Sequence, residues 1–310
     1  MKNIENDPEL HTEFIRRLNK IKNKDRYEKE DVEYIIEKVK GLQDFYYSEL
    51  EEVKEAKNID QFKQDLDYFF DKFFSKYEDP VKLFEHLEYH NKDFVYSNKI
   101  LQLYHMRRML HTQRDSDNHL IGIHDDLLNN LKLMLFLNYF ELFPRYIEPI
   151  FFDGMIGSKN YNYTMNKKGV PKARIWYNSL SMLTHEIIDY ETIQGRLFNL
   201  RNKLAHSESF VEGGKFIYLK FPENKEDKES FKEKNIKYLP TKKDIFKELE
   251  TIDVFQKLVI IISTDFDLRI LRLYNKINEV SDEAFRAWKK YVDNYINYWL
   301  IIGDKVHVTP

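Results

Sequence analysis

The chain contains no cysteine, which excludes disulfide cross-links, thiolate catalysis and zinc held by cysteine ligands. Glycine and proline are scarce, with 9 and 8 residues among 310. The lack of cysteine is compatible with a reducing compartment, and the polar N-terminal segment MKNIENDPELH has no apolar stretch of the kind found in signal peptides. We therefore expect a cytoplasmic protein.

Long apolar runs and a strong excess of charge of one sign are also missing. The longest apolar stretch, residues 131–143, is interrupted by Lys132, Asn138 and Glu141, and it is too short to span a membrane. The net charge is −3, so no overall positive field attracts nucleic acid. We expect no membrane contact, and any contact with RNA must be local.

Hydrophobic residues make up 42% of the chain and charged residues 33%, a composition typical of a folded, helix-rich protein. Apolar residues recur at three- and four-residue spacing, with charged residues between them, which predicts amphipathic helices. We therefore expect an all-α fold. In the first part of the chain the predicted helices cover residues 31–56, 62–74, 80–90 and 93–112.

The segment 62–74 carries a stripe of phenylalanines that has two interpretations. Such rings can stack on nucleic-acid bases, but at helical spacing they usually form a hydrophobic core, which is the interpretation we favour. The helix should stop before Asp79 and Pro80, because Asp79 can cap a new helix and Pro80 can open it.

The polar segment 113–126, TQRDSDNHLIGIHD, interrupts the helical pattern and is the best candidate for a domain boundary. We predict an N-terminal helical region at 1–124 and a second helical domain at 125–310. The second domain should begin with an apolar helix at 126–143 that is ended or kinked by Pro144. Another helix is predicted at 174–188.

A β-hairpin or extended arm is predicted at 210–221, with a glycine pair at its turn, followed by a solvated charged loop at 223–237. Together they suggest a small insertion at about 209–240. Two long helices at about 243–277 and 282–302 should then complete the domain.

The stretch Leu200–Ser207, LRNKLAHS, combines chemically active side chains with a helical frame. Leu197, Leu200 and Leu204 form the buried stripe of a helix that Asp189 or Thr192 can cap. The remaining edge presents Arg201, Asn202 and His206. A histidine can transfer the proton of an RNA 2′-hydroxyl or of the 5′-oxygen leaving group, and a guanidinium neutralises charge on the phosphate.

LFNLRNKLAHS resembles the Arg-polar-x3-His signature of HEPN (higher eukaryotes and prokaryotes nucleotide-binding) domains. The resemblance implies an all-α bundle at about 125–303 and a metal-independent endoribonuclease of a toxin or abortive-infection system in antiviral defence. It also implies that Arg201 and His206 are catalytic, with Asn202 beside them, and that two protomers form one composite site. Lys203 and Ser207 flank this edge and are candidate substrate contacts. The expected partners are RNA, a second copy of the chain, and an antitoxin or activating ligand.

Other patterns are weaker. Arg114 and His119 repeat the Arg-x4-His spacing, but they lie in the polar boundary segment, so we interpret this copy as coincidence. His86 and His90 have a spacing that can clasp a metal, yet without a third ligand they are more often surface residues. We predict no metal and no cofactor. The alternative function is a non-catalytic module that binds a nucleotide, RNA or a protein.

Three acidic side chains just before the motif could also contribute an acid near the site, although capping and surface exposure explain them as well. They are Glu186, Asp189 and Glu191.

Overall fold

The computed structural model describes most of the chain, and most of that part is helical, as expected for an all-α protein. The described residues are 8–53, 58–91, 99–100, 102–103, 106–107, 125–146, 180, 183–189, 191–205, 209–212, 215–220, 229 and 239–306. None of the helices in these ranges is long and apolar enough to cross a membrane.

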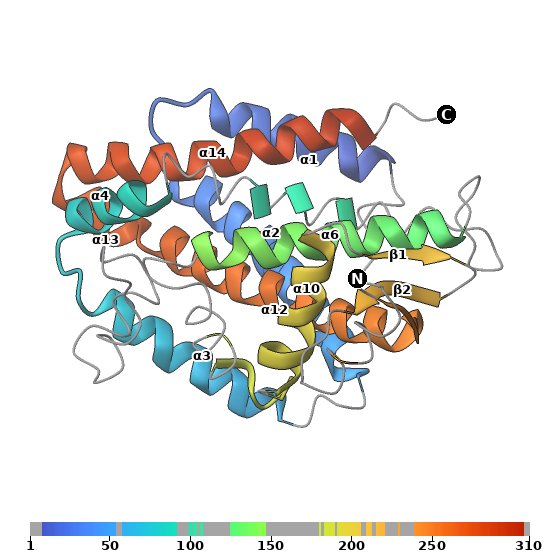
Figure 1. Cartoon of the computed structure of the whole chain (residues 1–310). Helices are drawn as coiled ribbons and strands as arrows, with labels where there is room; N and C mark the ends of the chain where they lie inside the picture. The colour runs from blue at the N-terminus through green and yellow to red at the C-terminus, as the bar shows by residue number, and fades with distance from the viewer. Residues whose placement is uncertain are drawn as a thin grey trace.

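The helices fall into two groups along the chain (Figure 1). The first group is α1 (Pro8–Lys22), α2 (Lys29–Glu51), α3 (Ile59–Phe74) and α4 (Pro80–Asn91). The second group is α6 (Asp125–Tyr146), the π-helix η2 (Thr192–Leu197), α10 (Phe198–Ala205), α12 (Ile245–Arg272), α13 (Tyr274–Val280) and α14 (Asp282–Val306).

Polar side chains fix the starts of α3 and α4. The Asn58 side chain accepts a hydrogen bond from the Gln61 N–H at 3.2 Å. Asp79 accepts one from the Val81 N–H at 2.9 Å, and Pro80 is the first residue of α4. The prediction that Asp79 caps a helix opened by Pro80 is therefore confirmed. Asp79 accepts from a backbone N–H that has no partner within the helix, and Pro80 has no N–H that would need one.

Helices from the two groups pack against each other. α2 lies on α12, while α1 and α4 pack against α14, so the first and last helices of the chain are side by side (Figure 1). Buried apolar side chains from Leu18 to Leu300 belong to one contiguous cluster. The helices on both sides of the predicted boundary thus share a core, while the segment 113–124 itself lies outside the described residues.

The phenylalanine stripe of α3 is part of this core. Phe62, Phe70 and Phe73 are fully buried, and the Phe70 ring lies 5.8 Å from that of Phe266 on α12. The core interpretation is confirmed, since rings buried in this way are inaccessible to nucleic-acid bases.

Aromatic contacts also position α6. The rings of Phe136 and Phe140 lie 5.8 and 5.2 Å from the Phe255 ring of α12. Aromatic pairs at these distances contribute packing energy beyond area burial. They fix one side of α6 against α12 and leave its opposite side facing outward.

A small antiparallel sheet follows the motif helix, with strand order β1-β2-β3. β1 (Ser209–Glu212) pairs with β2 (Lys215–Lys220) in the region where the sequence predicts a hairpin or arm. β3 (Leu239–Asp244) pairs along the other edge of β2. The prediction that a helix begins near residue 243 is wrong, because β2 offers a free edge whose backbone groups β3 satisfies, and α12 begins only at Ile245.

The predicted helix at 243–277 is also divided. The Ile270 carbonyl accepts hydrogen bonds from the Leu273 N–H at 3.2 Å and from the Trp288 indole at 2.9 Å. These bonds tighten the last turn of α12, and α13 starts at Tyr274. Two other predicted ends shift as well, since α2 ends at Glu51 and α6 continues through Pro144.

Candidate functional site

The described part of the motif, residues 200–205, lies on α10, which is preceded directly by the π-helix η2. Leu197, Leu200 and Leu204 are all buried, which confirms the predicted leucine stripe. The π-helical turn was not foreseen, because a single widened turn leaves no distinct pattern in the sequence. Such turns are rare and are frequently found at functional sites.

Asp189 caps the start of this helical segment. Its carboxylate accepts hydrogen bonds from the Thr192 N–H at 2.7 Å and from the Thr192 hydroxyl at 2.6 Å. These bonds hold the pKa of Asp189 below its usual value, the hydroxyl being the main cause. Of the two predicted caps, Asp189 is the one the structure uses.

Arg201 and Asn202 meet on the partly exposed edge of α10. A terminal guanidinium nitrogen of Arg201 donates to the Asn202 side-chain oxygen at 2.8 Å. Both side chains are half-buried beside the leucine stripe. The sequence predicts that Arg201 reaches the same place as Asn202, and the structure brings the two together.

Glu141 on α6 is the partner that sequence reasoning missed. It accepts a hydrogen bond from the Arg201 Nε and forms an ion pair with it, although the two residues are 60 positions apart. About a third of each side chain is exposed, so water screens the pair only in part. The signal that could have revealed it is a carboxylate inside the apolar run 131–143, where a charge generally needs a partner.

The structure describes only some of the other predicted site residues. Lys203 is described and half-exposed on the same helix. His206 and Ser207, which follow directly after α10 in the chain, lie outside the described residues. Arg114 and His119 of the second Arg-x4-His pair also lie outside them.

The acidic residues before the motif are mostly engaged locally. A carboxylate oxygen of Glu186 lies 3.0 Å from the His185 Nε2, and the Asp189 carboxylate is occupied by the cap. Glu191 is exposed at the start of η2. None of these described contacts directs a carboxylate to Arg201.

The first strand is fastened to α6 just beyond the motif. The Asn130 side-chain oxygen accepts from the Val211 N–H at 3.2 Å, and its amide donates to the Asp126 carbonyl at 2.8 Å. α6 therefore supports both ends of the motif region, with Glu141 holding α10 and Asn130 holding β1.

The outward side of α6 carries an apolar stripe next to this site. Leu127, Leu131 and Met134 are 54%, 39% and 50% exposed and follow one another at four- and three-residue spacing. Continuing that spacing along the same face leads to Asn138 and Glu141. The Glu141–Arg201 pair thus lies at the end of an exposed apolar stripe.

The predicted histidine pair shows no metal-site geometry in the described part of the chain. The His86 ring packs 5.2 Å from the Tyr77 ring and 6.5 Å from the Phe73 ring, and the side chain of His90 is outside the description. Among the described residues, no group of three or more His, Asp or Glu side chains is arranged to hold a metal ion.

Comparison with known proteins finds no matching family model, no matching curated protein and no matching solved structure.

Proposed function

We propose that the protein is a metal-independent endoribonuclease of HEPN type that acts in the cytoplasm as a toxin or abortive-infection effector in antiviral defence. Residues 125–310 would form the HEPN-like bundle, with 209–240 as an insertion and 1–124 as an added helical region. The observation that supports this proposal best is the contact between Arg201 and Asn202 on the edge of α10, immediately before His206 in the chain.

In the proposed reaction, the 2′-oxygen of the RNA attacks the adjacent phosphorus and the bond to the 5′-oxygen breaks. His206 moves a proton in this step, either from the 2′-hydroxyl or to the 5′-oxygen. Arg201 neutralises the charge that develops on the phosphate, and Asn202 fixes the guanidinium through its side-chain oxygen. Lys203 and Ser207 contact the substrate. The products are a 2′,3′-cyclic phosphate and a 5′-hydroxyl.

Glu141 would act as a positioning residue in this site. Its ion pair anchors the Arg201 Nε. The guanidinium is planar, so this contact also fixes the direction in which its terminal nitrogens point. We expect Glu141→Gln to lower kcat/KM for RNA by about tenfold, equivalent to about 1.4 kcal/mol of transition-state stabilisation. A merely structural role for Glu141 would change the melting temperature and leave kcat/KM within twofold.

A second copy of the chain would complete the site. One histidine supplies one proton transfer, whereas the reaction needs both a base and an acid. The stripe of Leu127, Leu131 and Met134 is an exposed apolar surface on the helix that carries Glu141, and contiguous surfaces of this kind mark interaction sites. Two copies meeting along α6 would bring their Arg201 residues to a shared interface.

The test is incubation of the purified protein with end-labelled RNA in EDTA, followed by analysis of the product ends. Wild type should yield 2′,3′-cyclic phosphates, and Arg201→Ala and His206→Ala should lose cleavage by at least a hundredfold. Arg16→Ala is the matched control, because this arginine is exposed on α1 and pairs only with its neighbour Glu13 in the described part of the chain. Intact RNA with wild type, with and without candidate activators, would refute the nuclease proposal.

One observation favours the alternative of a non-catalytic binding module. Arg201 is already engaged by Glu141 within the same chain, as in a structural ion pair that supports a binding surface. In that case wild type binds RNA or a nucleotide without cleaving it, Arg201→Ala weakens binding, and His206→Ala leaves growth of the expressing cells unchanged. A ribonuclease would instead slow growth, and His206→Ala would relieve the effect.

A further inference from the structure

An aromatic ring lies next to the proposed phosphate contacts. Phe198 is the first residue of α10, one helical turn before the contact between Arg201 and Asn202. Residues three and four positions apart share one face of a helix, so Phe198 is on the same edge as both. Its side chain packs against the core and stays partly exposed. The edge that presents Arg201 and Asn202 therefore also presents an apolar aromatic surface.

Gly195 lies in the turn directly before this ring, and its carbonyl accepts a hydrogen bond from the Phe198 N–H. A Cβ added at Gly195 would meet nothing within 4 Å apart from its chain neighbours and the backbone of its own helix, and the backbone is not left-handed. Neither packing nor conformation therefore requires glycine here, although glycine destabilises a helix relative to alanine. The absent side chain leaves open space in which a ligand can approach the backbone closely.

The charges around the ring favour an anionic ligand. The range Thr192–Ala205 contains Arg196, Arg201 and Lys203 and no acidic residue. Glu141 of α6 contributes one carboxylate, to Arg201. An aromatic ring beside cationic groups is the combination with which proteins bind single-stranded nucleic acid, because every base has a face that can stack and every nucleotide carries a phosphate.

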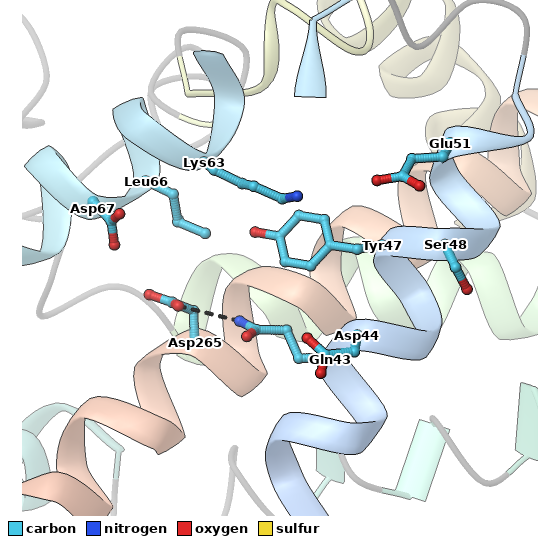
Figure 2. A pocket seen from close by; sticks show the side chains of 9 residues that line it. All are labelled: Gln43, Asp44, Tyr47, Ser48, Glu51, Lys63, Leu66, Asp67 and Asp265. Carbon is cyan, nitrogen blue, oxygen red and sulfur yellow. Dashed lines mark hydrogen bonds between the residues drawn. The ribbon is translucent and has the colours of Figure 1, made fainter. Parts of the chain in front are cut away.

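A second partly exposed ring, Tyr47 of α2, lies in the opposite environment. Figure 2 shows it in a pocket between α2, α3 and α12, which is lined by four carboxylates, among them Asp67 and Asp265. The Lys63 Nζ lies 4.6 Å from the centroid of the Tyr47 ring. Carboxylates repel a phosphate backbone, and an ammonium group already faces this ring. Tyr47 is therefore unsuited to stack on RNA and serves as a matched control for Phe198.

We propose that Phe198 stacks on a base of the RNA substrate and that the open space at Gly195 admits the edge of this base. The inference rests on the proposed function, because it adds a base-binding residue to the same site. Arg201 and Asn202 hold the phosphate while the adjacent base lies over the ring. A base can lie there only if it is unpaired and splayed out, so the substrate class is RNA that is single-stranded at the cleavage point.

The experiment measures binding by fluorescence anisotropy in EDTA, with the full-length His206→Ala protein as the parent so that the RNA stays intact. The probes are a labelled single-stranded RNA and a labelled chain of the same length whose nucleotides lack their bases. Phe198→Leu should weaken RNA binding about tenfold, equivalent to about 1.4 kcal/mol, which lies within the range for base–aromatic stacking. Its affinity for the base-free chain should stay within twofold of the parent. Phe198→Tyr keeps a ring and should bind RNA as the parent does.

Gly195→Gln fills the open space with a helix-forming residue. It should weaken RNA binding at least fivefold without lowering the melting temperature, a combination that a folding defect does not produce. Tyr47→Leu removes a partly exposed ring that also packs against the core, and it should leave the affinity for both probes within twofold.

The inference is overturned if Phe198→Leu binds the RNA as tightly as the parent, or if it loses as much affinity for the base-free chain. An equal loss in Tyr47→Leu, or an unchanged RNA affinity of Gly195→Gln, would also overturn it. Cleavage is scored separately with wild type. RNA that binds in the expected pattern but is never cut refutes the nuclease proposal and supports base stacking.

Discussion

Asp253 is a carboxylate whose removal should strongly destabilise the protein, because it is paired with a buried arginine. Arg107 is only 4% exposed, and its guanidinium donates to Asp253 on α12 and to the Tyr46 hydroxyl at 3.2 Å. Lys257 is also buried and pairs with Asp253 at 2.9 Å and with Glu49 at 3.3 Å. In Asp253→Ala, Lys257 keeps Glu49, but Arg107 becomes a buried cation with no carboxylate partner among the described residues.

Removing one partner of a buried ion pair costs about 3–5 kcal/mol. The Asp253 side chain is 29% exposed, so water reaches part of the site and we expect the lower end of that range. A loss of about 3 kcal/mol, with an unfolding entropy of about 2.1 cal/mol/K per residue, lowers the melting temperature by roughly 5 °C for a chain of this length.

The assay is thermal and urea unfolding followed by far-UV circular dichroism. Glu13→Ala is the control, because it breaks an ion pair between two exposed side chains and should change the free energy of unfolding by no more than about 0.5 kcal/mol. Arg107→Met/Asp253→Leu, which removes both charges, should recover most of the loss. The reasoning is refuted if Asp253→Ala and Glu13→Ala have the same free energy of unfolding. It is also refuted if the protein unfolds in two separate transitions and Asp253→Ala shifts only one of them.

Three further outcomes are expected. Asp189→Ala should cost about 1 kcal/mol at neutral pH through loss of the cap on Thr192. The pKa of Asp189 is lowered in the folded protein, so the difference in the free energy of unfolding between wild type and Asp189→Ala is complete above the unfolded-state pKa of about 3.9. This difference disappears as the pH falls below that value. Urea unfolding between pH 2.5 and 7 measures it. Trp288→Ala should cost about 3–5 kcal/mol by the same method, since the ring is fully buried and its indole bonds the Ile270 carbonyl. If the proposed dimer forms along α6, Leu131→Lys should convert it to a monomer in light scattering without lowering the melting temperature, because this side chain is 39% exposed. A lower melting temperature with an unchanged mass would contradict this prediction.

Helices with a clear apolar stripe were predictable within a few residues. α3, α4 and α14 begin and end close to the expected positions, because residues three and four apart lie on one face and the pattern is local. Ends that depend on distant partners were not predictable. α12 stops at Arg272 because Trp288, from another helix, bonds its last turn.

The strand β3 shows the same limit. Its sequence, LPTKKD, has no apolar alternation, so the sequence predicts no strand there and places its last two residues in a helix. It becomes a strand because β2 presents an edge of unpaired backbone groups. Backbone hydrogen bonding to a neighbouring strand requires no particular side chain, and so it leaves little trace in the sequence.

For the candidate site, the functional residues of α10 could be predicted from the sequence, but the residues of other helices that contact them could not. The leucine spacing predicted which side of the helix is buried and which side presents Arg201 and Asn202. The structure added Glu141 as the partner of Arg201. No local pattern connects two residues 60 positions apart.

Composition and periodicity alone determined that this protein is a mostly helical chain and that the face of α10 carrying Arg201 and Asn202 is turned away from the core. These properties follow from local spacing on a helix. Only the tertiary structure decided that Glu141 holds Arg201, that Arg107 is buried against α12, and that a pocket rich in carboxylates opens between α2 and α3. Ion pairs and pockets form between segments distant in the chain, and packing, not spacing, selects which charges meet.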